Sequence, residues 1–148
     1  MKISDILRHK HTAPGTSVVT IAPSDTVTTL LATLAEHNVG ALLVVDPGAD
    51  GAVAGIVSER DIVRRIAQDG AHVLEQPVSV IMTSGVVSCS SSDSVDSIAE
   101  TMTTRRIRHM PVIDNGILTG IVSIGDVVSS RIRQLEHDRG QLEQYISS

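Results

Sequence analysis

Aromatic residues are almost absent from this chain of 148 residues. It has no tryptophan and no phenylalanine, and Tyr145 is its only tyrosine. The hydrophobic core must therefore be built from valine, isoleucine, leucine, alanine and methionine. Proteins that read single-stranded nucleic acids stack the bases on aromatic side chains, so this composition disfavours that class.

Basic residues are also in the minority. Twelve lysines and arginines stand against 17 aspartates and glutamates, and the formal net charge is −5 at pH 7. Proteins that bind nucleic acids neutralise phosphates with lysine and arginine. We therefore expect no nucleic-acid partner.

Cysteine and long apolar runs are scarce as well. Cys89 is the only cysteine, which excludes an internal disulfide and fits a reducing compartment. No apolar run approaches the 18 residues of a membrane span, and the first ten residues lack the apolar stretch of a secretory signal. The expectation is a cytoplasmic protein without a membrane partner.

Sequence motifs for catalysis are missing too. The chain has no Walker loop, no Gly-x-Gly-x-x-Gly and no set of Ser, His and Asp that suggests a nucleophile with its base. His9 and His11 stand two apart but make only a weak case for a metal. Nothing in the sequence proposes a reaction, so a protein without enzymatic activity and without a metal is expected.

What the chain does contain is a repeat. Residues 19–27 align with residues 87–95 at an offset of 68, and residues 55–63 align with residues 120–128 at an offset of 65. A repeated unit this short usually buries its apolar face against its twin. Small ligands tend to bind in the clefts at such a seam.

The first copy is predicted to run strand, helix, strand, strand, helix. Strands are expected at 17–22, 39–45 and 53–57, and the second helix is expected from Ser58 to about Gln68. Ser24 or Asp25 is expected to cap the first helix. Its apolar face shows helical spacing: Val27, Leu30, Leu31 and Leu34.

The second copy repeats this order. Strands are expected at 86–89, 110–113 and 117–122, with Asn115-Gly116 as a hairpin turn. The matching helical face is Val95, Ile98, Ala99 and Met102. Residues 77–82 resemble residues 3–7, so a short lead-in helix is expected before each copy. This divides the chain into residues 1–76, 77–131 and a helical extension at 132–148.

The last helix, expected from about Gly125 to Tyr145, carries apolar residues four and three apart. They form a heptad pattern with one polar interruption: Val128, Ile132, Leu135, Arg139, Leu142 and Ile146. Two interpretations are open. The helix lies along its own domain, or it forms a seam between two chains.

The sharpest local motif is a serine followed three residues later by an aspartate. Ser58 with Asp61 and Ser123 with Asp126 each follow a Gly-Ile-Val strand end and open a helix. One interpretation is a capping box at each helix start. The other is a binding corner, in which the carboxylate accepts the hydroxyls of a ribose while the helix N-terminus attracts phosphate.

This duplicated unit, with Gly-Ile-Val-Ser-x-x-Asp in each copy and Arg-His-Met-Pro-Val in the second, resembles the cystathionine β-synthase (CBS) domain. Two units in tandem look like a Bateman module, and the resemblance covers residues 4–131. It implies an α/β fold of two β-α-β-β-α repeats packed sheet to sheet about a pseudo-two-fold axis, plus a long C-terminal helix. It also implies two clefts for adenine nucleotides such as AMP, ADP, ATP or NAD.

The resemblance assigns roles to particular residues. Asp61 and Asp126 would hold ribose hydroxyls, with Ser58 and Ser123 beside them. The adenine would lie among aliphatic groups along the first strand and the start of the second in each copy: Thr20, Ile21, Ala22, Val39, Gly40 and Ala41, and Ser88, Cys89, Ser90 and Ile107.

Basic residues distinguish the second copy. Arg105, Arg106, Arg108 and His109 form the only dense basic cluster, which reads either as a solvated helix end or as a phosphate site. The first copy lacks this cluster and offers only Arg60. The second cleft is therefore expected to bind phosphorylated ligands better.

The expected function is a stand-alone, non-catalytic regulatory sensor of adenine nucleotides that acts in signal transduction. By the same resemblance a homodimer is expected, with an effector protein of unknown kind. The alternative is a structural or protein-interaction module whose clefts are vestigial. An enzyme that turns over the nucleotide is the third possibility.

Overall fold

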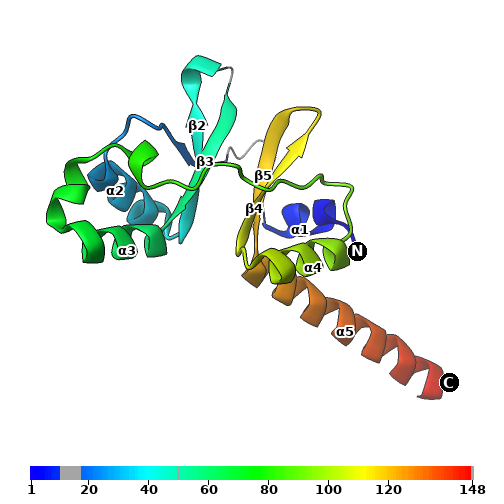
Figure 1. Ribbon diagram of the computed structural model, residues 1–148. Helices are drawn as coiled ribbons and strands as arrows, with labels where there is room; N and C mark the ends of the chain where they lie inside the picture. The colour runs from blue at the N-terminus through cyan, green and yellow to red at the C-terminus, as the bar shows by residue number, and fades with distance from the viewer. Residues whose placement is uncertain (11–17, 50, 148) are drawn as a thin grey trace. The chain divides into compact units, whose positions relative to one another are not determined.

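The computed structural model of the protein describes residues 1–10, 18–49 and 51–147 (Figure 1). Two compact units are present. One comprises Ser17–Val87, and we call it the first-repeat unit; the other comprises Met1–Thr16 with Ser88–Ser148, and we call it the second-repeat unit. His11 and the start of the strand expected at 17–22 lie outside the described residues.

The first-repeat unit follows the predicted order of elements. Its strands and helices are β1 (Thr20–Ile21), α2 (Val27–His37), β2 (Ala41–Asp46), β3 (Ala52–Ser58) and α3 (Glu59–Asp69), with short 3₁₀ turns η1 (Pro47–Ala49), η2 (Ala71–Glu75) and η3 (Val78–Val80). The sheet order is β1-β2-β3. β1 runs parallel to β2, and β2 runs antiparallel to β3.

The second-repeat unit is built in the same way. It contains α1 (Ile3–Lys10), α4 (Val95–Arg105), β4 (His109–Asp114), β5 (Ile117–Ser123) and α5 (Ile124–Ser147). β4 and β5 form the predicted hairpin, and both Asn115 and Gly116 have positive φ, as a tight two-residue turn requires. Residues 86–89, which were expected to form a strand, make only a single parallel bridge, between Cys89 and Val112.

The core is aliphatic, as the composition requires. In α2 the predicted apolar face is buried at Val27, Leu30 and Leu34, whereas Leu31 is exposed. The matching face of α4 is buried at Val95, Ile98 and Met102. Strand residues complete the cores, among them Leu43, Val44, Val57, Met110, Val112 and Val122.

The first helix of the first repeat begins with a different cap from the one predicted. Thr26 caps α2 by accepting a hydrogen bond from the Thr29 amide, and Ser94 caps α4 by accepting one from Ser97. The prediction of Ser24 or Asp25 as the cap was wrong. The Asp25 carboxylate instead accepts the Ala22 amide at 3.0 Å and closes the turn that precedes the helix.

The lead-in segments are exchanged between the repeats. The Val27 amide at the start of α2 donates to Gln76, which precedes the second repeat in the chain, while the Val95 amide of α4 donates to Met1. Matching bridges join Thr26 to Pro77 and Lys2 to Ser94. The N-terminal segment therefore groups with the second repeat in space, whereas the chain order had placed it with residues 1–76.

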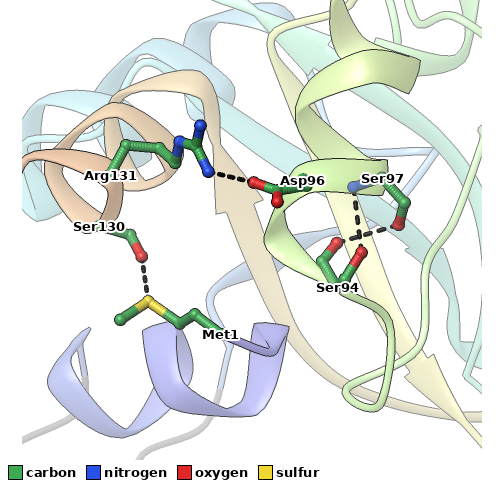
Figure 2. A network of polar contacts seen from close by, with 6 residues as sticks. All are labelled: Met1, Ser94, Asp96, Ser97, Ser130 and Arg131. Atoms are coloured by element: carbon green, nitrogen blue, oxygen red, sulfur yellow. Dashed lines mark hydrogen bonds and ion pairs between the residues drawn. The ribbon is translucent and has the colours of Figure 1, made fainter. Parts of the chain in front are cut away.

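Polar contacts tie the start of α5 to its own unit (Figure 2). The Arg131 guanidinium contacts the Asp96 carboxylate on α4, and the Ser130 hydroxyl contacts the sulfur of Met1. Ser130 is fully buried. The first two turns of α5 are thus held in place by α4 and by the N-terminal residues.

Candidate functional site

Each repeat has a corner where one strand ends and a helix begins. In the first repeat, antiparallel pairing sets Ala41 opposite Ser58, and the Glu59 amide donates to the Gly40 carbonyl at 3.0 Å. In the second, His109 lies opposite Ser123, and the Ile124 amide donates to the Arg108 carbonyl at 2.8 Å. The sheet therefore brings the start of the second predicted strand beside the Ser-x-x-Asp motif in both copies.

Both motifs form capping boxes. The Ser58 amide donates to Asp61 Oδ2 at 2.8 Å, and the Asp61 amide donates to the Ser58 hydroxyl oxygen at 3.4 Å. The equivalent distances for Ser123 and Asp126 are 2.9 and 3.1 Å. The structural interpretation of the motif is therefore confirmed in each copy.

The capping bonds involve one oxygen of each aspartate carboxylate. Asp61 Oδ2 accepts both the amide and the hydroxyl of Ser58, and Asp126 Oδ2 accepts the Ser123 amide, whereas a carboxylate has about four lone-pair positions on its two oxygens. Both aspartates are half-buried at a helix N-terminus, where partial positive charge gathers. The same side chain can hold the helix end and accept a ligand hydroxyl.

Asp126 also faces a cavity within the second-repeat unit. This cavity of about 180 Å³ is lined by Ile6 and His9 from α1 and by Asp126, Ser129 and Arg133 from α5. The three α5 residues are spaced three and four apart, which places them on one face of the helix. An acid, a hydroxyl and two basic side chains thus share one hollow.

Sequence reasoning missed most of this lining. Ser129 and Arg133 were not singled out, although their spacing from Asp126 is a signal that could have found them. His9 was considered only as a weak metal ligand. Its place beside Asp126 follows from the exchange of the lead-in segment, which no local pattern reveals.

The predicted phosphate residues are spread over the two corners. Arg108 is exposed and His109 is half-buried, next to Ser123. Arg105 ends α4, and Arg106 is its C-cap in a left-handed conformation with φ of 55°. Arg60 is exposed in the first turn of α3. Of the described residues that line the cavity, the basic ones are His9 and Arg133.

The residues predicted to line an adenine pocket divide by exposure. Ile21, Ala41 and Cys89 have buried side chains. The others are exposed or half-buried: Thr20, Ala22, Val39, Gly40, Ser88, Ser90 and Ile107. Aliphatic contacts with a base would therefore come from Val39 in the first repeat and Ile107 in the second, each just before its strand.

Cys89 is the equivalent of Ile21. Ile21 pairs with Val44 and Cys89 with Val112, both in parallel. Burial raises the pKa of the Cys89 thiol to about 12, and the nearby carboxylates of Asp93 and Asp114 add to the rise. The thiol is thus a neutral, buried group.

The two corners differ in charge. In the first, the residue beside Gly40 is the acidic Glu59, whose carboxylate would lie 3.8 Å from a Cβ placed on Gly40. In the second, the matching pair is Arg108 and the apolar Ile124. The second corner is therefore more favourable for an anion.

Across the part of the chain that the structure describes, no three His, Cys, Asp or Glu side chains gather to hold a metal ion. None of the described helices combines the length and apolarity needed to cross a bilayer.

Comparison with known proteins gives a consistent picture. Residues 3–68 and 78–133 each match the CBS domain. The CBS domain-containing protein CBSX3, mitochondrial, of Arabidopsis thaliana is 36% identical over 146 residues, which cover 97% of this chain and 71% of that protein. The crystal structure of the CBS-domain protein ATU1752 from Agrobacterium tumefaciens is 44% identical, with a TM-score of 0.80, and the match covers 88% of this chain and 92% of that one.

Two similar structures contain ligands. The CBS domain protein PAE2072 from Pyrobaculum aerophilum, solved with AMP, is 29% identical with a TM-score of 0.73, and the match covers 85% of this chain and 89% of that one. The CBS domain pair of protein MJ0100 was solved with 5-methylthioadenosine and S-adenosyl-L-methionine. It is 25% identical with a TM-score of 0.74, and the match covers 92% of this chain and 98% of that one.

Proposed function

The chain belongs to the CBS-domain family, and from that premise we propose that it is a non-catalytic sensor that binds an adenosine-containing ligand at the second-repeat corner. The ligands of the two similar structures, AMP, 5-methylthioadenosine and S-adenosyl-L-methionine, differ in what the 5′ carbon carries. They share the adenosyl group, which is adenine joined to a ribose ring with its 2′ and 3′ hydroxyls. The common part of the ligand is therefore the part that this family site would recognise.

The observation that carries the proposal is the cavity beside Asp126. Its carboxylate lines a hollow of about 180 Å³ together with Arg133 and His9. Pockets that enclose a whole drug-sized ligand are about 300–1,000 Å³. The hollow fits a sugar and its phosphate, and the base lies outside it.

In this arrangement Asp126 accepts the ribose hydroxyls while it still caps α5. The Arg133 guanidinium and the His9 ring hold the phosphate, with Arg108 nearby on the adjoining strand start. The first repeat has the acidic Glu59 in place of Ile124, so phosphorylated ligands such as AMP, ADP, ATP or NAD prefer the second repeat. Binding there stabilises the contact between α1 and α5 and shifts the protein toward the conformations in which that contact is formed.

The proposal is tested by calorimetric titration of AMP into the wild type, Asp126→Ala and the matched control Asp61→Ala. Each substitution removes one capping box and lowers the free energy of unfolding of the ligand-free protein by about 0.5–2 kcal/mol. Both variants therefore melt at a lower temperature than the wild type. Only Asp126→Ala lowers the affinity for AMP, by tenfold or more, which is about 1.4 kcal/mol. Equal affinities of all three proteins would contradict the ribose role.

Arg133 provides a second arm of the same experiment. If its guanidinium binds the phosphate, Arg133→Ala removes most of the preference for AMP over adenosine and leaves adenosine binding unchanged. No heat and no thermal shift with any adenine nucleotide at millimolar concentration would instead favour an interaction module with vestigial clefts, because a bound ligand stabilises the folded state in proportion to its occupancy.

A further inference from the structure

The outer part of α5 has an apolar face that its own unit does not cover. α5 has 24 residues, which corresponds to about 36 Å of helix. Only Val127 and Ser130 on it are buried. Figure 1 shows the helix running out past α4 and the β4-β5 hairpin of the same unit. Figure 2 shows that Ser130 and Arg131 hold its beginning.

The exposed apolar residues of α5 form a single stripe. Ile132, Leu135, Leu142 and Ile146 are 51%, 65%, 62% and 76% exposed. With Val128 and Arg139 they repeat every four and three residues, and we call these six residues the α5 seam. Of the two interpretations of this helix, the one in which it lies along its own domain is not supported, because these residues are exposed. A helical stretch of about 15 residues without tertiary packing is marginal in water, so the exposed part of α5 needs a partner.

We propose that the α5 seam pairs with the same seam of a second copy of this chain as a parallel two-stranded coiled coil. In heptad terms Ile132, Arg139 and Ile146 occupy the a positions, and Val128, Leu135 and Leu142 occupy the d positions. A β-branched residue at a with leucine at d is the combination that favours parallel dimers. The contact belongs to the C-terminal helix and needs no ligand.

The middle layer explains why the partner is another copy. Arg139 is the one polar a residue, and the acidic Asp138 and Glu143 flank it at the neighbouring g and e positions. Its Nε donates to Glu143 of the same helix at 3.1 Å. In a parallel pair the two arginines of this layer meet four carboxylates, so a second copy supplies the complementary charge. A single polar a residue also specifies register at some loss of stability.

The first test is sedimentation equilibrium of the full chain over a range of concentrations. The seam spans fewer than three heptads, so the wild type is expected to be a weak dimer whose mass rises with concentration. Leu135→Glu with Leu142→Glu should remain monomeric. The matched control, His137→Glu with Gln144→Glu, adds the same two carboxylates on the opposite face of the helix and should still dimerise. Arg139→Leu should lower the dimer dissociation constant by tenfold or more.

The second test is disulfide cross-linking, which reads the orientation directly. In a parallel register each residue of the seam faces its own counterpart, so Leu142→Cys should form a covalent dimer under mild oxidation. Gln144→Cys, on the outer face, should not. The native Cys89 is buried, so the wild type provides a clean background.

Three results would overturn the proposal. The first is a monomeric wild type at all concentrations together with no cross-link at Leu142→Cys. The second is a dimer that Leu135→Glu with Leu142→Glu leaves intact, which would place the contact elsewhere. The third is a dimer in which Leu142→Cys fails to cross-link but a mixture of Val128→Cys chains and Ile146→Cys chains forms a mixed disulfide, because those two positions meet only in an antiparallel pair. Circular dichroism melting of each variant confirms that it is folded.

Discussion

At the scale of single residues, Cys89 and Ile21 occupy equivalent positions in the two repeats but differ in chemistry. Both side chains are buried beside the same strand position, Val112 in one repeat and Val44 in the other. A thiol is a small, weakly polar group and packs there much as an aliphatic side chain does. Unlike Ile21, however, Cys89 can ionise, and this gives the second repeat a sensitivity to high pH.

The pKa of Cys89 predicts a loss of stability in alkali. Burial raises this pKa from 9.0 to about 12. Between these values the unfolded chain releases a proton that the folded chain keeps, so the free energy of unfolding falls as the pH rises from about 9 to 12 and is unaffected by this group below pH 9. Urea unfolding at several pH values should show the loss in the wild type and a smaller one in Cys89→Val. Parallel pH profiles of the two proteins would contradict the assignment.

At the scale of elements, the ends of α2 and α4 repeat the same backbone geometry with different residues. Asn38 and Arg106 both follow their helix in the left-handed region, with φ of 51° and 55°. Glycine adopts this conformation freely and asparagine tolerates it, whereas a long side chain such as arginine is strained there. Arg106 therefore carries a local cost that Asn38 largely avoids.

We expect Arg106→Gly to stabilise the protein. Relief of the left-handed strain contributes about 1 kcal/mol, which corresponds to a rise in melting temperature of about 2–4 °C for a chain of this size. Asn38→Gly is the matched control and should change the melting temperature less. Calorimetric melting measures both, and AMP titration of Arg106→Gly separately tests the proposed phosphate role. A lower melting temperature for Arg106→Gly would show that its side chain makes a stabilising contact that outweighs the strain.

At the scale of the whole molecule, each repeat is completed by the segment that precedes the other one in the chain. Two glycines at equivalent positions mark the contacts. A Cβ on Gly55 would lie 2.7 Å from the Thr83 carbonyl oxygen, and a Cβ on Gly120 would lie 2.8 Å from the tip of the Leu7 side chain. Both contacts bring a lead-in segment against a strand.

The two contacts predict unequal effects of the same substitution. Gly55→Ala should destabilise the protein by about 1–3 kcal/mol, because the backbone carbonyl of Thr83 cannot yield without disturbing its bridge to Ile56. Gly120→Ala should cost less, because the end of Leu7 can rotate away. Urea unfolding of the two variants measures the difference. Equal losses would contradict the picture of a rigid contact in one repeat and a soft one in the other.

Short-range patterns in the sequence were enough to predict the order of the helices and most strands, the hairpin at Asn115-Gly116 and both Ser-x-x-Asp motifs, although the strand expected at 86–89 is a single bridge. These features depend on residues a few positions apart, whose spacing and hydrogen-bonding capacity act locally. The prediction was wrong at the N-cap of α2, which is Thr26 and not the neighbouring Ser24 or Asp25. The Asp25 carboxylate accepts the Ala22 amide in the turn before the helix, so it does not cap the helix.

The sequence by itself determined that the core is aliphatic, that the unit occurs twice, and that each second helix begins at a Ser-x-x-Asp motif. Only the tertiary structure decided which lead-in segment completes which repeat. It thereby placed His9 and Arg133 around Asp126 and left the outer half of α5 uncovered. The physical reason is that these arrangements depend on contacts between segments far apart in the chain, such as Val27 with Gln76 and His9 with Asp126. Their pairing is chosen by packing of the whole chain and leaves no periodic trace in the sequence.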